Sequence, residues 1–113
     1  MSQSIVPMRG EVWEARVPRA GVHPVVILTI NVLRSRLSSV TVAVTTGTRG
    51  PASTHVAVGM EAGLSKYPES YVNATDIHTI PTASCRARRG LLAPPELAAL
   101  EEALRTYLGL HRR

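Results

Sequence analysis

The sequence has 113 residues, the size of a single domain. Its 44% hydrophobic and 19% charged residues are typical of a globular chain and exclude intrinsic disorder. The longest apolar run is far below the roughly 18 residues that a membrane-spanning helix needs, so we expect no membrane. The net charge of +5 lies mostly in the first half. That excess favours a polyanionic partner, either nucleic acid or an acidic peptide, although solubility explains it equally well.

The chain ends and the single cysteine set further limits. We expect residues 1–7 to be a disordered tail, 8–110 to form the domain and 111–113 to be a basic tail. The first residues lack a basic region followed by an apolar core, so they do not resemble a signal peptide. Cys85 has no partner for an internal disulfide and fits a reducing, cytoplasmic compartment.

The hydrophobic pattern predicts short strands along most of the chain. Residues 9–17 alternate, with Trp13 pointing inward. Residues 24–29 are almost wholly apolar and predict a strand buried on both faces, which Pro24 can only open because it lacks an amide hydrogen. His23 is therefore expected where this rigid strand meets a loop. Weaker patterns predict a helical turn at 30–37 and strands at 40–46, 54–58, 70–72, 77–80 and 90–92, with a polar connector at 82–89.

Residues 93–108 are the clearest helix. Pro94 suits the first helical position, and Glu96 is favoured there by the helix dipole. Gly109 is expected to end the helix in the left-handed conformation. Short strands followed by one terminal helix, without crossover helices between the early strands, predict a mainly β domain. A small barrel closed by the C-terminal helix is the natural architecture.

Several kinds of functional motif are missing. The glycines near residue 47 lack the lysine and the helix of a phosphate-binding loop. His23, His55 and His78 do not have metal-ligand spacing, and no nucleophile elbow of a serine hydrolase occurs. We expect neither a metal nor another cofactor.

Several segments, read in order, form one pattern. The most specific are RGEVW at residues 9–13 and TDIHTI at 75–80; PVVI at 24–27 and VAVTT at 42–46 lie between them. In this order the sequence resembles the MazF/PemK family, the ribonuclease toxins of bacterial toxin–antitoxin pairs, over residues 8–110. The resemblance implies an SH3-like barrel that forms a homodimer and is silenced by a cognate antitoxin. It also implies a metal-independent endoribonuclease that leaves 2′,3′-cyclic phosphate and 5′-OH ends and so inhibits translation and growth.

The resemblance implies a catalytic pair, with one departure. The family has an arginine immediately before the proline of the second strand, where this chain has His23. Arginine grips a phosphate with two donors, whereas histidine can accept or donate a proton near neutral pH. The family's site threonine falls on Thr45, although a shift of one residue would select Thr46. Adjacent strand residues point to opposite faces, so we expect only one of the two to line the groove.

Further candidates surround this pair. Arg49 follows Thr46 on a loop and can position a phosphate. His78 departs from the family, Thr79 matches it, and both are possible RNA contacts. Arg86, Arg88 and Arg89 can add positive charge, although a basic connector is usually only solvated.

Two other interpretations remain open at this point. The loss of the arginine fits a degenerate member that only binds RNA, and a related gyrase-poisoning toxin shares the barrel. The first connection, at residues 18–22, is short for the family. It predicts an open groove whose substrate is a structured loop of tRNA or rRNA, not only a linear mRNA site.

Overall fold

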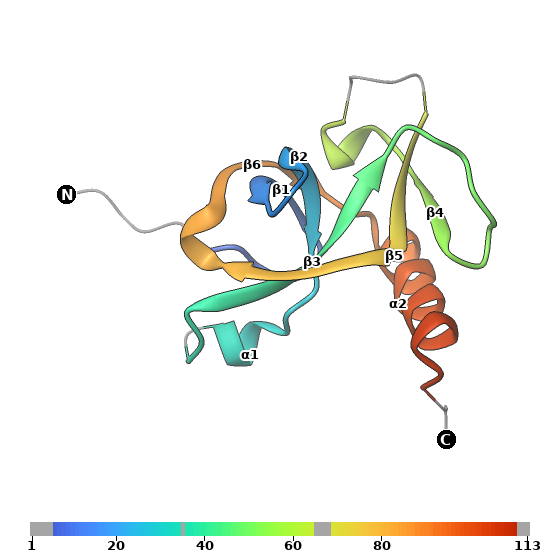
Figure 1. Ribbon diagram of the computed structural model, residues 1–113. Helices are drawn as coiled ribbons and strands as arrows, with labels where there is room; N and C mark the ends of the chain where they lie inside the picture. Colours follow the sequence, from blue (N-terminus) through green and yellow to red (C-terminus); the bar gives the residue numbers. More distant parts are fainter. Residues whose placement is uncertain (1–5, 35, 65–68, 111–113) are drawn as a thin grey trace.

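The computed structural model describes residues 6–34, 36–64 and 69–110 (Figure 1). The expected tails fall mostly outside this range, since 1–5 and 111–113 are not described, while Pro7 is buried. Among the described residues, no helix has the length and hydropathy needed to cross a bilayer. The elements in order are β1 (Glu11–Val17), β2 (Gly21–Ile27), α1 (Asn31–Arg34), β3 (Ser39–Thr46), β4 (His55–Val58), η1 (Met60–Ala62), β5 (Ser70–Pro81), η2 (Thr82–Ser84), β6 (Cys85–Leu91) and α2 (Pro94–Leu108).

The six strands form one antiparallel sheet in the order β4-β5-β3-β2-β1-β6. The helix α2 packs against β4 and β5, and the short helix η2 packs against β1 and β3 where the chain turns from β5 into β6. The sheet therefore curls like an open barrel, with α2 beside it (Figure 1). The predicted mainly β fold with a C-terminal helix is confirmed.

Two apolar cores lie on opposite faces of the sheet. One is shared with α2 and includes Val26, Ala43 and Leu100. The other lies inside the curl and includes Trp13 and Val25. Because successive residues of β2 face opposite cores, the central strand is buried on both faces, as its unbroken apolar run predicts.

Pro24 lies in the middle of β2, so the prediction that it opens the strand is wrong. Its carbonyl oxygen accepts a hydrogen bond from Thr45 Oγ1, which shows that its amide side faces β3. Backbone pairing between β2 and β3 begins one residue later, at Val25 and Val44. The missing amide hydrogen is therefore not needed, and β2 continues back to Gly21 to pair with β1.

Two other predictions for the second half are corrected. The strands expected at 70–72 and 77–80 are one strand, β5, which pairs with β4 and with β3 across a register irregularity. The polar connector expected at 82–89 contains η2 and most of β6. As an edge strand with mostly exposed side chains, β6 lacks the alternating apolar pattern by which a strand is recognised.

The terminal helix follows its prediction closely. Glu96 Oε1 accepts a hydrogen bond from the backbone nitrogen of Ala93 at 2.8 Å, which satisfies the helix start although alanine is a poor cap. Gly109 ends the helix with φ 70°, in the left-handed region. The inward face places Leu100 and Ala103 in the core beneath α2.

Candidate functional site

A pocket of about 470 Å³ lies where β1, β2 and β3 meet β5 and β6. We call it the strand-end pocket. Its walls come from five strands and the loop after β3, so side chains far apart in the sequence are brought together on rigid elements. The polar residues that line it are Glu14, His23, Thr45, Thr46, Thr48, Ser70 and Arg89.

His23 is held in this pocket by the strand that carries it. It pairs with Ala15 of β1 and is only partly buried. Pro24 follows His23, and the three residues after it, Val25 to Ile27, are fully buried. The two cores therefore fix the strand that carries the imidazole. A fixed backbone with an accessible ring is the arrangement that proton transfer needs.

Thr45 and Thr46 both line the strand-end pocket, so the prediction that only one of them can do so is wrong. Thr45 is 8% exposed, and its hydroxyl donates to the Pro24 carbonyl at 2.9 Å. Thr46 Oγ1 accepts from the backbone nitrogen of Thr48 at 3.1 Å. Strand alternation places Thr46 on the same face as His23 and Thr45 on the other. The pocket lies at the strand ends and is lined from both faces.

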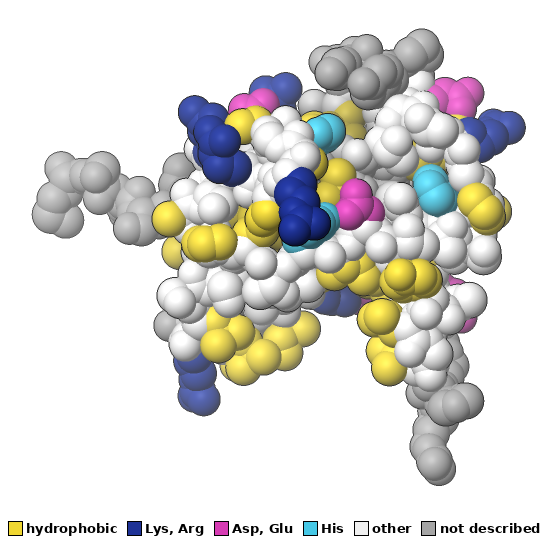
Figure 2. All heavy atoms as spheres, viewed as in Figure 1, with side chains coloured by type: hydrophobic (Ala, Val, Ile, Leu, Met, Phe, Trp, Pro, Cys, Tyr) yellow, Lys and Arg dark blue, Asp and Glu magenta, His cyan; other side chains and the backbone are white. Residues whose placement is uncertain are grey.

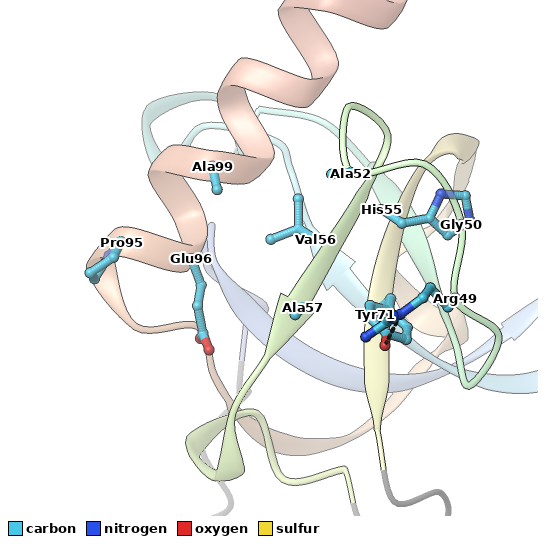
Figure 3. A pocket seen from close by; sticks show the side chains of 10 residues that line it. All are labelled: Arg49, Gly50, Ala52, His55, Val56, Ala57, Tyr71, Pro95, Glu96 and Ala99. Carbon is cyan, nitrogen blue, oxygen red and sulfur yellow. Dashed lines mark hydrogen bonds between the residues drawn. The ribbon is translucent and has the colours of Figure 1, made fainter.

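Arg49 lies apart from this group. It lines a second pocket of about 590 Å³ beside the edge strand β4 and the start of α2 (Figure 3). Its Nε donates to the hydroxyl of Tyr71 at 3.3 Å, and Glu69 lies 3.8 Å from its guanidinium. The hydrogen bond with Tyr71 is the main reason that the pKa of Arg49 is raised. The predicted phosphate contact of Arg49 is thus not in the strand-end pocket.

The candidates on β5 have partners of their own. His78 Nε2 lies 2.6 Å from Asp76 Oδ1, and Thr79 Oγ1 lies 2.8 Å from the hydroxyl of Thr41 on β3. Neither His78 nor Thr79 is among the residues that line the strand-end pocket. Their proposed contacts with RNA would lie outside it.

Of the three basic candidates on β6, Arg89 lines the strand-end pocket, whereas Arg86 and Arg88 lie outside it. Arg88 Nε donates to Glu11 Oε2 at 2.8 Å, an ion pair that joins β6 to β1. Arg86 is exposed. Cys85, on the same strand, packs against the core inside the curl, and burial raises its pKa to about 11. Its thiol therefore stays protonated at neutral pH and serves as a small apolar side chain.

Sequence reasoning missed one charged residue of the pocket, Glu14, and grouped another, Arg89, with Arg86 and Arg88 as basic residues of a connector. Glu14 faces away from Trp13 on β1, and alternation alone shows this, but nothing in the sequence shows that this face meets Pro24 of β2 and, beyond it, Thr45 of β3. Arg89 was read as part of a connector. Its place in the pocket depends on the pairing of β6 with β1, which no local pattern reveals.

The pocket combines an imidazole, hydroxyl groups, a carboxylate and a guanidinium. The first can accept or donate a proton, the hydroxyls can orient an oxygen atom, and the guanidinium can bind an anion. Within residues 6–34, 36–64 and 69–110, no group of three or more histidine, cysteine or acidic side chains lies close enough to bind a metal ion. The described residues are suited to acid–base chemistry on an anionic substrate.

Comparison with protein families gives a match over residues 8–108 to the PemK-like, MazF-like toxin of the type II toxin–antitoxin system. A curated relative from Mycobacterium tuberculosis, a probable endoribonuclease MazF2, is 33% identical over 102 residues. The alignment covers 89% of this chain and 97% of the relative.

Solved structures give the same result for the fold. A mycobacterial endoribonuclease in complex with its cognate antitoxin superposes with a TM-score of 0.83 and 29% identity, covering 95% of this chain and 99% of that chain. The M. tuberculosis toxin MazF-mt6 superposes with a TM-score of 0.79 and 32% identity, covering 90% of this chain and 99% of that chain.

Proposed function

The chain belongs to the PemK-like, MazF-like family of toxins of type II toxin–antitoxin systems, and we propose that it is an endoribonuclease that arrests growth by cleaving RNA. The observation that carries this proposal is the strand-end pocket, which His23, Thr45 and Arg89 line from three strands of one sheet. Such a pocket supplies a proton acceptor, a hydroxyl and a positive charge, which the cleavage of a phosphodiester by a neighbouring hydroxyl requires.

In the proposed reaction, His23 takes the proton of a ribose 2′-OH. The 2′-oxygen forms a bond to the adjacent phosphorus, and the bond from phosphorus to the 5′-oxygen breaks. The leaving oxygen takes up a proton, which solvent can supply, so the products are a 2′,3′-cyclic phosphate and a 5′-OH. The hydroxyl of Thr45 keeps its lone pairs available while it donates to Pro24. It can orient the bound 2′-OH by accepting its hydrogen bond, and that single proton then turns to His23 for the transfer. Because the 2′-OH is the nucleophile, DNA is not a substrate.

We further propose that the substrate is a structured RNA loop, of tRNA or rRNA in addition to mRNA. The support is the connection between β1 and β2, which is a tight hairpin whose last pair is Val17 and Gly21. Only three residues, 18–20, lie beyond that pair, so little chain stands over the mouth of the pocket. We expect the enzyme to act in the cytoplasm, where these RNAs are found.

The proposed partners are a cognate antitoxin and a second copy of this chain. An acidic antitoxin segment that covers the strand-end pocket would complement the net charge of +5. The homodimer is supported by apolar side chains on α1 and on the end of α2, which project from the same side of the sheet (Figures 1 and 2). We call this the α1–α2 surface; its exposed residues are Ile30, Val32, Leu33, Leu37, Tyr107, Leu108 and Leu110.

The test is to incubate the purified protein with total RNA in EDTA and to map the ends of the fragments. We expect cleavage with 5′-OH ends, and sites in tRNA or rRNA loops. His23→Ala should lower the rate by roughly 10²–10⁴-fold, the usual contribution of a proton-transfer group. His55→Ala is the matched control, because His55 lines the pocket beside β4 instead. Intact RNA, or DNA damage without RNA cleavage, would refute the nuclease, and sites confined to unstructured mRNA would refute the choice of substrate.

A further inference from the structure

We propose that Arg89 holds the scissile phosphate in the strand-end pocket, while His23 transfers the proton. This inference rests on the proposed nuclease function and assigns the role of positive charge within it. Of the described residues that line this pocket, Arg89 is the only arginine. Of the Arg89 guanidinium and the His23 imidazole, only the guanidinium stays charged at every relevant pH and can donate two hydrogen bonds to one phosphate.

The charges in the pocket require such a group. Glu14 brings a carboxylate to the same walls, and a carboxylate repels a phosphate. His23 must be neutral to accept a proton, so it cannot offset that repulsion at the start of the reaction. Arg89 supplies the positive charge from β6. This strand lies two places from β2 in the sheet, because β6 pairs with β1 and β1 pairs with β2.

The pairing of β6 with β1 has a register irregularity at Arg89. Val12 of β1 pairs with Gly90, but the next residue, Trp13, pairs with Arg88. One step along β1 therefore matches two steps along β6, and Arg89 is the extra residue of a β-bulge. Bulges turn a side chain away from the regular alternation and are frequent beside active sites. Arg88, which remains paired, instead holds Glu11 at 2.8 Å.

The backbone on both sides of this bulge is fixed by close packing against η1. A Cβ atom added to Gly63 would lie 2.1 Å from the carbonyl oxygen of Arg89. One added to Gly90 would lie 2.2 Å from the carbonyl oxygen of Glu61. The two glycines thus allow the segment after η1 and the bulge to touch directly. A rigid bulge is what a phosphate-binding side chain needs for a defined position.

Arg89 is exposed, and no described residue forms an ion pair with its guanidinium. This distinguishes Arg89 from Arg9, Arg49 and Arg88, whose guanidinium groups are bound to Glu101, Glu69 and Glu11. An arginine that is fixed at its backbone and unpaired at its tip is available for a ligand.

The chain provides a matched control in Arg86. The pairing of Glu14 with Ala87 and of Ala15 with Cys85 makes Arg86 the extra residue of a second bulge in the same strand. Arg86 is also exposed, but it does not line the pocket. Arg89→Ala and Arg86→Ala therefore change the same net charge in the same kind of local structure.

The test compares these variants in RNA cleavage and in the binding of an RNA whose reactive 2′-OH is replaced by 2′-O-methyl. Arg89→Ala should lower kcat/KM by about 10²-fold, as expected for the loss of a charge-stabilising donor. It should also lower the dependence of binding on salt by about one phosphate contact. Arg86→Ala should leave kcat/KM within about threefold of wild type. Arg89→Lys should recover part of the loss, and His23→Arg introduced into Arg89→Ala should restore binding of the methylated RNA but not cleavage.

The outcomes separate this inference from the function on which it rests. If wild type cleaves RNA and Arg89→Ala behaves like Arg86→Ala, the role of Arg89 is refuted and the nuclease stands. If wild type does not cleave RNA, the nuclease is refuted, and the binding measurement still decides whether Arg89 contacts the RNA backbone. Thermal unfolding accompanies each assay. If Arg89→Ala does not fold, the comparison of Arg89→Lys with Arg86→Lys takes its place, and equal activities would again refute the role.

Discussion

Thr45 Oγ1 donates a 2.9 Å hydrogen bond to the carbonyl oxygen of Pro24, so the hydroxyl on β3 is tied to the residue that follows His23 on β2. This bond lies beyond the point where the backbones of β2 and β3 begin to pair. It joins the two strands at the mouth of the pocket and uses the proton of the hydroxyl, which leaves its lone pairs for a ligand.

Substitution of Thr45 separates these two uses of the hydroxyl. Thr45→Val keeps the shape but removes the oxygen, so it should lower the free energy of unfolding by about 1 kcal/mol and RNA cleavage by at least tenfold. Thr45→Ser should retain most of the activity. Cleavage assays with urea denaturation measure both effects. Full activity in Thr45→Val would show that the hydroxyl only joins the strands.

The carboxylate of Glu11 makes stability depend on pH. Burial by itself raises its pKa, but hydrogen bonds from Trp13, from the Met8 backbone and from Arg88 outweigh burial and lower it below the ordinary value of 4.5. A lowered pKa stabilises the folded state above the unfolded pKa, and this contribution is lost as the pH falls through the folded pKa. Glu11→Gln should therefore cost about 1 kcal/mol at pH 7 and less at about pH 3.

Urea denaturation of wild type and Glu11→Gln at both pH values checks this expectation. Glu61→Gln is the control, because Glu61 is an exposed carboxylate on η1. A penalty for Glu11→Gln that is the same at both pH values would mean that its charge does not matter to stability.

Two glycines with positive φ test the contact between η1 and β6. Gly63 and Gly21 have φ values of 74° and 80°, so alanine costs roughly 1–2 kcal/mol at either position from backbone strain. Only at Gly63 does the new Cβ also collide with the carbonyl oxygen of Arg89; at Gly21 nothing lies within 4 Å. Gly63→Ala should therefore destabilise more than Gly21→Ala in urea, and equal losses would contradict the close packing.

The proposed homodimer can be tested at the α1–α2 surface. Leu108 is 52% exposed at the end of α2, where it also lines a groove with Leu104 and Ile77. A charge in an apolar interface is strongly unfavourable, so Leu108→Glu should convert the dimer into monomers. Leu91→Glu is the control, because Leu91 is 46% exposed on β6. Sedimentation at several concentrations measures the change, and a dimer that persists in Leu108→Glu would place the interface elsewhere.

The parts of the fold that the sequence predicts are those with strong local patterns. The apolar run of β2, the β-branched run of β3 and the amphipathic stripe of α2 all have their predicted structure. The edge strand β6 does not, because its stability comes from backbone pairing with β1 and not from an alternating apolar face. Long-range pairing of this kind leaves no periodic signal.

The residues of the candidate site were also predicted only in part. His23 and one of the two threonines, Thr45 or Thr46, were expected together because their strands are recognisable and the family resemblance aligns them. Arg49 follows Thr46 closely in sequence, yet the loop carries it to Tyr71 and another pocket. Arg89 is distant in sequence and was expected only as one of three basic connector residues, yet of these three it alone lines the pocket. Sequence proximity is therefore a poor guide to which arginine can reach the phosphate.

The position of β2 between two cores has a consequence for how the molecule is controlled. Amide hydrogens of a strand buried on both sides exchange with solvent only when the whole domain opens. The backbone that follows His23, from Val25 to Ile27, is therefore expected to resist local melting. Inactivation without loss of the fold is therefore expected to require a bound molecule that occupies the opening of the strand-end pocket at His23.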